Sequence, residues 1–417
     1  MTASVTVSHP HGNPNSYHAA KAFADTGLLN IFERGFVTGR FASKALADLP
    51  QGRKALQRGL GQLANGGNRQ HLLWEVISRV GKRLKSTGPT QKVSWYDVLY
   101  CGHDWQVSKA LRKGMTAVYA YEDGACLTFR EAKRTRAATI YELPAGYYAG
   151  VAHELDRARD NSREPVFNIK TEPRWKMRRK DHELSLADVI VVPCEWAAES
   201  LRFSGINTEK AVIKVPYGTP AVEVFPKLER PRGPFTVLFA GQVGARKGVP
   251  YLLEAWSQLG LKNARLLLAG GMKLNDAFLS RYSGNFEYLG ALPRLQLLKL
   301  MKEVDLLVFP SLAEGFGLVI GEAMAAGTPV LTTTNTGGPE LITNGREGWC
   351  VPAHDAQVLA ERIEWAYQHR DELFEMGRRA RQRAEQWTWA DYRHSLIEKI
   401  MPHLNGVAAS SSSYVEV

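Results

Sequence analysis

The stretch EGFGLVIGEAMAAGTPV, residues 314–330, places two carboxylates eight positions apart among glycine and alanine residues. Glu314 precedes a glycine-rich turn, and Glu322 falls inside the helix that the pattern predicts after it. The free amides of residues 317–319 would begin this helix, where the positive end of the helix dipole suits a diphosphate. The glycines let a ligand approach the backbone, and Glu322 can accept hydrogen bonds from a vicinal diol such as a ribose. The alternative is a surface loop followed by a helix charge worth ~0.3–1 kcal/mol.

A second candidate for chemistry is FAGQVGARKG, residues 239–248. Its glycines are spaced G-x-x-G-x-x-x-G, which matches neither the phosphate loop that ends in G-K-[ST] nor the dinucleotide fingerprint G-x-G-x-x-G. Arg246 and Lys247 still place two cations beside glycines, a composition that suits a phosphate pocket, with an ordinary surface turn as the alternative. TTTNTGGPELI, residues 332–342, is either a further wall of the same pocket or a plain turn with a helix N-cap.

Each of these loops follows a short apolar run, namely TVLFAG, DLLVFP and PVLTTT. Such runs are typical of strands buried on both faces of a parallel sheet, and open parallel sheets bind ligands at the carboxyl ends of their strands. The first half of the chain repeats the pattern with TAVYAY, ATIYEL and DVIVVP, separated by helix-like stretches. The fold class predicted is therefore α/β, with two doubly wound domains.

The 417 residues suit two domains of similar size. A segment rich in proline and glycine, residues 213–235, separates the two series of strands. We predict a first domain over 1–216, a second over 217–388, a helix over 389–407 that crosses back to the first domain, and a disordered tail over 408–417.

Composition indicates a folded soluble protein, with 44% hydrophobic and 23% charged residues. No apolar run approaches the ~20 residues that a membrane span needs, and the N-terminus does not follow the plan of a signal peptide. The four cysteines are scattered without metal-ligand spacing, so we expect free thiols and a cytoplasmic protein.

The net charge of +11 is confined to the first half of the chain. Residues 1–216 contain 32 Lys/Arg and 21 Asp/Glu, whereas residues 217–417 contain 21 of each sign. Within residues 34–85 there are eleven basic residues against two acidic ones. Nucleic acid, anionic lipid headgroups or a phosphorylated acceptor would each explain this field, and so would a solvated basic face that binds nothing.

The combination of the two glutamates with the glycine loop before them and TGGPELI after them resembles the retaining glycosyltransferases of family 4 (glycosyl transferases group 1). ELSLADVIVVPCEWAAESL followed by KVPYG also looks like that family's exit from its N-terminal domain. The resemblance covers residues 183–390 closely and the N-terminal part in outline. It implies the GT-B fold, in which two Rossmann-like domains face each other across a cleft.

The resemblance also implies a role for each matching residue. Lys247 and Arg246 would neutralise the donor diphosphate, Glu322 would hold the ribose hydroxyls, and Glu314 would face the donor sugar as a catalytic residue. Gln242 departs from the family, where arginine is common, and makes Arg246 the candidate replacement cation. The predicted donor-binding set is Gly244, Arg246, Lys247, Gly315, Phe316, Gly317, Leu318 and Glu322.

Many relatives carry a histidine after a strand of the N-terminal domain, but the corresponding ends AVYAYEDG and TIYELPAG have none. Glu142 is our candidate for the second catalytic residue. His9 and His11 are alternatives at the end of the first strand, and we expect His103 to start a helix.

The implied reaction moves a sugar from a UDP- or GDP-linked donor to the hydroxyl of a glycan or a lipid-linked saccharide. Front-face attack would retain configuration. Protein cations would do the work of a metal, so we expect no metal and no further cofactor.

Other classes of protein fit less well. An NAD-dependent oxidoreductase needs a dinucleotide fingerprint that HPHGNPNS does not supply. A non-catalytic protein that binds nucleotide sugars or an anionic surface is the alternative function, and we expect no nucleic acid partner. Residues 51–85 mix cations with leucine and tryptophan, which suits peripheral binding to the inner face of a membrane. We predict salt-sensitive binding to anionic liposomes, lost when Arg79, Lys82, Arg83 and Lys85 become glutamine.

Overall fold

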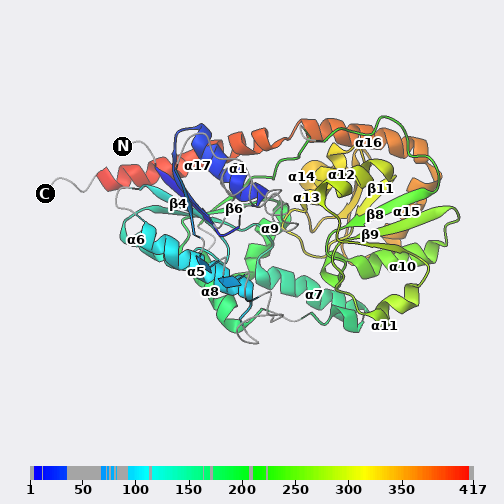
Figure 1. Ribbon diagram of the computed structural model, residues 1–417, viewed down its shortest axis with the longest axis horizontal. Coiled ribbons are helices and arrows are strands. Elements are labelled where there is room, and N and C mark those ends of the chain that lie inside the picture. The colour runs from blue at the N-terminus through cyan, green and yellow to red at the C-terminus, as the bar shows by residue number, and fades with distance from the viewer. Residues whose placement is uncertain are drawn as a thin grey trace, which may run out of the picture.

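The computed structural model describes residues 4–11, 13–34, 67–71, 73–74, 77–78, 81, 93–111, 115–162, 164–169, 172–205, 210–221 and 224–412. Within these ranges the chain forms two parallel sheets flanked by helices, arranged end to end along the long axis (Figure 1). The four basic residues expected to bind liposomes, Arg79, Lys82, Arg83 and Lys85, lie outside the described residues.

The first sheet has the strand order β3-β2-β1-β4-β5-β6-β7 over the described residues. Its strands are β1 (Val5–His9), β2 (Leu29–Arg34), β3 (Gly67–Gln70), β4 (Ala117–Tyr121), β5 (Ala138–Glu142), β6 (Val189–Val192) and β7 (Ala211–Lys214). The accompanying helices are α1 (Pro14–Asp25), α5 (Trp95–Ala110), α6 (Cys126–Arg134), α7 (Tyr148–Ser162), η1 (Pro165–Phe167), α8 (Arg174–Leu186), α9 (Glu195–Ser200) and η2 (Leu201–Phe203).

The second sheet has the order β10-β9-β8-β11-β12-β13. Its strands are β8 (Phe235–Ala240), β9 (Ala264–Ala269), β10 (Glu287–Gly290), β11 (Leu306–Phe309), β12 (Val330–Thr333) and β13 (Gly348–Val351). Its helices are η3 (Ala245–Lys247), α10 (Val249–Leu259), α11 (Asp276–Leu279), η4 (Ser280–Tyr282), α12 (Arg294–Glu303), α13 (Leu318–Ala325), α14 (Gly338–Leu341), α15 (Ala356–Gln368) and α16 (Arg370–Glu385).

The predicted α/β class with two doubly wound parallel sheets is confirmed. Strands β4, β5, β6, β8, β11 and β12 correspond to the six apolar runs, and their residues are buried on both faces, as parallel strands between helix layers require. In each sheet the chain order reverses beside the first strand, between β1 and β4 and between β8 and β11. Ligands of open α/β sheets bind at such reversal points, beyond the carboxyl ends of the strands.

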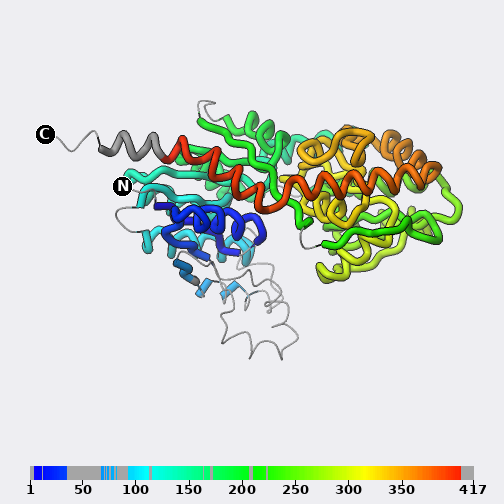
Figure 2. The backbone as a smooth tube through the Cα atoms, turned by 90° about the horizontal axis from the view of Figure 1, so that it is seen from above, coloured from blue at the N-terminus to red at the C-terminus, as the bar shows by residue number. Residues whose placement is uncertain are grey.

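The last helix, α17 (Trp389–Ser412), leaves the second sheet and runs back over the first (Figure 2). The His18 ring of α1 stacks on Trp389 with centroids 4.3 Å apart, and Arg393 Nε lies 3.4 Å from Asp25 Oδ2. The helix continues beyond residue 407, where we predicted its end, into the stretch expected to be a tail.

One local prediction was wrong. His103 does not start a helix: α5 begins eight residues earlier at Trp95, because Ser94 and Asp97 form a capping box there. His103 is buried inside the helix, 3.2 Å from the Ser8 hydroxyl. Among the residues placed by the structure, none of the helices is both long and apolar enough to cross a membrane.

Candidate functional site

The loop that carries Glu314 joins β11 to α13 and is shaped by a glycine. Gly317 has φ 84° and ψ 70°, and a Cβ built there would lie 2.9 Å from the Phe309 ring. Both conditions favour glycine, so the chain turns sharply and α13 begins at Leu318. Ile320 and Ala323 are fully buried and hold the helix against the sheet. The free amides of the first helical turn therefore follow closely after Glu314.

Lys247 and Glu314 form an ion pair between two neighbouring loops. Lys247 ends η3 after β8, and Glu314 follows β11, the strand beside β8. The two loops are in close contact at Gly248, where φ is 70°. A Cβ built there would lie 1.7 Å from the Pro310 carbonyl oxygen. Burial lowers the pKa of Lys247, and the nearby positive charge of Arg246 lowers it further. The adjacent Glu314 carboxylate acts on this pKa in the opposite direction. The pair places a cation and a carboxylate at the carboxyl edge of the sheet.

Arg246 is fastened to the same loop by both its side chain and its backbone. Nη1 donates to the Ala313 carbonyl oxygen at 2.8 Å, and the Arg246 carbonyl oxygen accepts from the Leu312 amide at 3.0 Å. Burial lowers the pKa of the guanidinium. The idea that Arg246 replaces an arginine at Gln242 stays a prediction, and Gln242 itself is an exposed residue of the cavity described next.

A cavity of about 400 Å³ lies between the two sheets at the carboxyl ends of β8 and β9. One wall consists of Gly244, Arg246 and Lys247, three of the predicted donor-binding residues. Lys273 and Asn275, from the loop after β9, form a second wall, and Asn168 and Ile169, which follow η1, close it from the first unit. A volume of this size is within the range of small-molecule sites.

Sequence reasoning missed Lys273, Asn168 and Ile169. Lys273 lies beside Gly244, because its amide donates to the Val243 carbonyl oxygen at 2.8 Å. The motif AGGMKLN, a glycine pair after an apolar run followed by lysine, is the signal that would have identified it. Residues 168–169 give no comparable signal, since they enter the cavity from the other unit.

Glu322 lies on α13 and pairs with Arg294, the first residue of α12, with Nε and Oε1 3.1 Å apart. About a sixth of the Glu322 side chain is exposed, whereas Arg294 is half exposed, with 54% accessible. Because exposed ion pairs are weak, ligand hydroxyls can compete for this carboxylate. Its role at a ribose stays a prediction.

Gly315 and Phe316 pack against the first unit. A Cβ at Gly315 would lie 1.8 Å from the Pro144 carbonyl oxygen, and Cys194 Sγ donates to the Gly315 carbonyl oxygen at 2.7 Å. The Phe316 ring is buried, with its centroid 5.4 Å from that of Tyr217. These two residues therefore join the units, and a direct contact with the donor stays a prediction for both.

Glu142 ends β5, but its carboxylate is buried in a cluster of hydroxyl groups. Tyr119 and Tyr217 each donate to it at 2.5 Å, and Asn15 donates at 3.4 Å. Burial raises the pKa of Glu142, and the two tyrosine hydrogen bonds partly oppose that shift. These partners tie β4, β5 and α1 to the connection after β7, which is what a positioning residue does. The catalytic role of Glu142 remains a prediction.

The two histidines after β1 differ in accessibility. His9 is buried, and burial together with His11 lowers its pKa to about 3, so the ring is neutral at ordinary pH. His11 is partly exposed and meets Tyr96 and Tyr100 edge-on, with ring centroids 5.8 and 5.6 Å apart. Of the two, His11 is the one that a bound substrate can reach.

A charged network closes the carboxyl end of β4. Lys176 Nζ lies 3.1 Å from both Asp97 Oδ1 and Asp123 Oδ2, and Lys180 Nζ lies 3.3 Å from Glu122 Oε2. Burial raises the pKa of Glu122 to about 7, although Lys180 opposes the shift. The network ties α5 and α8 to the loop after β4. Within the described ranges, no cluster of His, Cys, Asp and Glu could hold a metal ion.

Comparison with known proteins follows the division seen in the fold. Residues 222–387 match the family model described as "Glycosyl transferases group 1". Over 285 residues the chain is 27% identical to the "Putative colanic acid biosynthesis glycosyltransferase WcaL" of Escherichia coli (strain K12). The matched region covers 64% of this chain and 66% of that protein. The chain is 30% identical over 243 residues to "D-inositol 3-phosphate glycosyltransferase" of Arthrobacter sp. (strain FB24), covering 53% and 57%.

Two solved structures cover nearly the whole chain. Sucrose-phosphate synthase from Thermosynechococcus elongatus has a TM-score of 0.66 at 16% identity and covers 97% of this chain and 99% of its own. Anabaena Alr3699/HepE in complex with UDP-glucose has a TM-score of 0.60 at 15% identity and covers 96% and 99%. These likenesses show that the fold is GT-B. The family model and the fold together support a glycosyltransferase.

Proposed function

We propose that this chain is a retaining glycosyltransferase of family 4 that moves a hexose from a nucleoside diphosphate donor to a hydroxyl group. The observation that carries the proposal is the ion pair of Lys247 with Glu314 between the loops after β8 and β11, next to the interdomain cavity. A transferase needs cations for the leaving diphosphate and a carboxylate near the reacting sugar. The two loops bring both together at the edge of the sheet where ligands of this fold class bind.

The proposed mechanism follows from the charges that develop during transfer. Breaking the bond between sugar and phosphate leaves positive charge on the sugar and negative charge on the diphosphate. Arg246, Lys247 and the amides of Gly317 and Leu318 would stabilise the diphosphate, and Glu314 would stabilise or orient the sugar. The acceptor hydroxyl attacks from the face that the diphosphate leaves, and the leaving phosphate takes its proton, so configuration is retained. We propose that no metal takes part, because the cations and amides supply the charge.

We add Lys273 to the proposed diphosphate site. It lies beside Gly244 and lines the same cavity as Arg246 and Lys247. Arg246 is already bonded to the Ala313 carbonyl oxygen and Lys247 to Glu314, so a further lysine strengthens the positive field where Gln242 carries no charge. The diphosphate would thus meet cations from two neighbouring strand ends.

UDP is the donor nucleotide we favour, because the HepE structures are complexes with UDP or UDP-glucose. The acceptor we favour is a glycan or a lipid-linked saccharide, consistent with the colanic acid biosynthesis named for the Escherichia coli relative. We place this activity at the inner face of the membrane, where such acceptors are built.

The test is a thermal-shift screen of the purified chain against UDP, GDP and ADP and their sugars, followed by assay of nucleotide release from the donor it identifies. A donor that binds the folded chain raises the melting temperature by mass action. We expect Glu322→Ala and Lys247→Ala to weaken donor binding, since a lost charged hydrogen bond costs ~1.5–3 kcal/mol, and Glu314→Gln chiefly to lower turnover. Glu361→Ala, an exposed carboxylate on α15, is the matched control.

Three results would contradict the proposal. Wild-type affinity and turnover in all three site variants would overturn the site. Binding without turnover would favour the non-catalytic alternative. Loss of activity in EDTA with recovery in magnesium or manganese would overturn the metal-free mechanism.

A further inference from the structure

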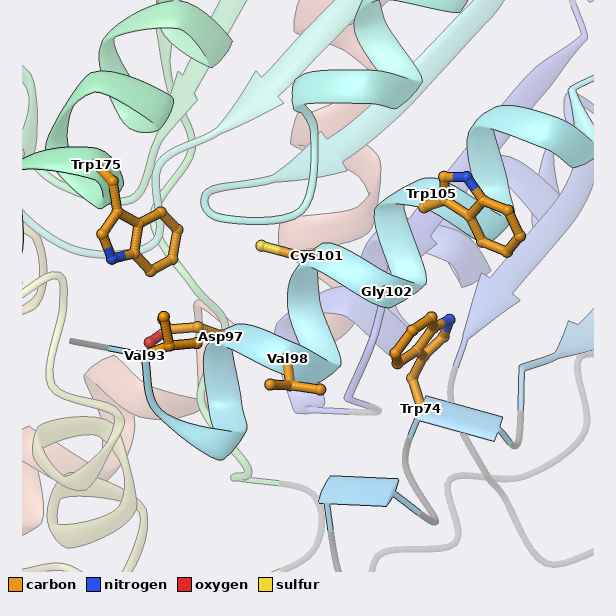
Figure 3. A pocket seen from close by; sticks show the side chains of 8 residues that line it. All are labelled: Trp74, Val93, Asp97, Val98, Cys101, Gly102, Trp105 and Trp175. Carbon is orange, nitrogen blue, oxygen red and sulfur yellow. The ribbon is translucent and has the colours of Figure 1, made fainter. Parts of the chain in front are cut away.

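A second cavity, of about 610 Å³, lies against α5 (Figure 3) and shares none of its described lining residues with the cavity at the donor-binding loops. Trp74, Trp105 and Trp175 stand around it, and Val98 and Cys101 of α5 lie between them (Figure 3). Its described lining residues all belong to the first unit, and none of them lines the donor cavity described above.

The lining of this cavity suits a hydrocarbon rather than a sugar ring. Asp97 is the one carboxylate among its described lining residues, and that carboxylate already accepts from the Ser94 amide and hydroxyl, both at 2.7 Å, and pairs with Lys176 at 3.1 Å. A sugar would leave many hydroxyl groups without partners against the indole rings, which is costly. An apolar chain would lose no hydrogen bonds there.

One end of the cavity adjoins the carboxyl edge of the first sheet. Asp97 lines the cavity, and Lys176 bridges it to Asp123, which follows β4. Under the proposed function the acceptor hydroxyl must reach that edge, because the donor is held by the opposite unit. A ligand whose polar end lies near the loop after β4 can therefore extend its other end past Lys176 into the cavity.

The rim of the cavity and the charge of its sequence neighbourhood indicate an amphiphile with an anionic head. Trp105, which lines the cavity, has 48% of its surface exposed, and Leu73, next to Trp74 in the sequence, has 54% exposed. Exposed aromatic residues of this kind are common where a protein meets lipid. Trp74 also belongs to residues 34–85, where eleven basic residues face two acidic ones in the sequence. This excess of basic residues in the sequence, most of which fall outside the described residues, favours a phosphate-bearing lipid among the amphiphiles.

We propose that the cavity formed by Trp74, Trp105, Trp175, Val98 and Cys101 binds the apolar chain of a lipid-linked acceptor. The inference rests on the proposed function, because it assigns the acceptor of that same reaction. Trp105 and Trp175 pack against the apolar chain of the lipid, and the polar end of the acceptor lies toward Asp123.

Cys101 supplies a direct report of occupancy. The full-length chain is alkylated with N-ethylmaleimide near pH 9, because burial raises the pKa of this thiol, and each cysteine is followed by peptide mass spectrometry. The probe is dodecyl phosphate below its critical micelle concentration. We expect it to slow alkylation of Cys101 by about tenfold while Cys126 and Cys350, which lie outside the cavity, keep their rates. Inorganic phosphate and maltose should protect neither cysteine.

Two variants link the protection to the cavity. Trp105→Ala removes a half-exposed wall, and Val98→Asp places a charge against the chain, so each should weaken protection by about tenfold. UDP stabilisation, measured in parallel, should be unchanged in both, because neither residue touches the donor cavity.

Every other outcome overturns the inference. Protection by maltose would mean a sugar site, and protection that grows with protein concentration would mean a second copy. If Cys101 resists alkylation as strongly as buried Cys194 in the absence of any probe, the protein itself already fills the cavity. Equal slowing of all cysteines would mean a non-specific detergent effect. Absence of Cys101 protection in the wild-type protein, with intact UDP stabilisation, defeats this inference alone. Absence of stabilisation by any nucleotide defeats the proposed function.

Discussion

Adding one methyl group at Gly315, by the substitution Gly315→Ala, should lower turnover while leaving donor binding nearly unchanged. A Cβ there would lie 1.8 Å from the Pro144 carbonyl oxygen and 2.6 Å from the Ala145 Cα. A carbon–oxygen contact needs ~3.3 Å, so Gly315→Ala must push the Pro144 backbone away by roughly 1.5 Å. Both clashing atoms belong to the backbone, which cannot move aside as a flexible side chain would. The same shift lengthens the hydrogen bond from Cys194 Sγ, now 2.7 Å, to the Gly315 carbonyl oxygen.

The expected magnitude follows from that displacement. A misplacement of ~1 Å between reacting groups can cost about a hundredfold in rate, so turnover should fall by at least this factor. Affinity for UDP should change by less than about threefold, because the cavity lined by Arg246, Lys247 and Lys273 is built mostly from the second unit. Overpacking at the contact should also lower the free energy of unfolding by ~1–3 kcal/mol.

The assay compares nucleotide release from the donor identified by the thermal screen with UDP affinity from titration calorimetry. Gly271→Ala is the matched control, because a Cβ there meets nothing within 4 Å and its φ lies outside the positive range. It should retain turnover and UDP affinity. Wild-type turnover in Gly315→Ala, or an equal loss in both variants, would refute the role given to the contact between the units.

Two further perturbations test other parts of the structure. Lys273→Met should weaken UDP binding by about tenfold or more while leaving uridine binding unchanged. The control Lys262→Met, at the opposite end of β9, should change the binding of neither ligand. Equal effects of the two substitutions would remove Lys273 from the diphosphate site. Burial lowers the pKa of Lys227 to about 7, and its Nζ donates to the Val304 carbonyl oxygen at 2.7 Å. Between about pH 7 and 10 the unfolded chain holds this proton and the folded chain does not, so raising the pH should stabilise the wild type relative to Lys227→Met by up to ~1.4 kcal/mol per pH unit in chemical denaturation. A difference that stays flat across this window would contradict the shift.

The strands and their loops could be predicted because their signals are local. Runs such as TVLFAG and DLLVFP are apolar at every position and end in glycine or proline, and they became β8 and β11 with the expected loops after them. The signal for the start of α5 was equally local, because SWYD forms a capping box. Our prediction that His103 starts a helix overlooked this box.

The contacts that complete the site depend on residues distant in sequence. Lys273 reaches Gly244 through a bridge between Val243 and Met272, which forms after β8 and β9 pair. Glu142 could be placed at a strand end, but its burial depends on Tyr217, which lies 75 residues further along the chain. Composition alone does not encode either contact, since each requires the folded sheet to exist first.

The last helix has a consequence for how the chain is made. Every strand of the first sheet has been synthesised by Lys214, yet Tyr392, Leu396 and Ile400 of α17 are fully buried, and this helix packs along α1 of that unit. At ~5–20 residues per second, a ribosome needs roughly 10–35 s to reach α17 after β7. During that interval the nascent first unit exposes the apolar surface of α1 that α17 later covers, which is the kind of surface that chaperones bind. The unit that leaves the ribosome first is therefore the one that is completed last.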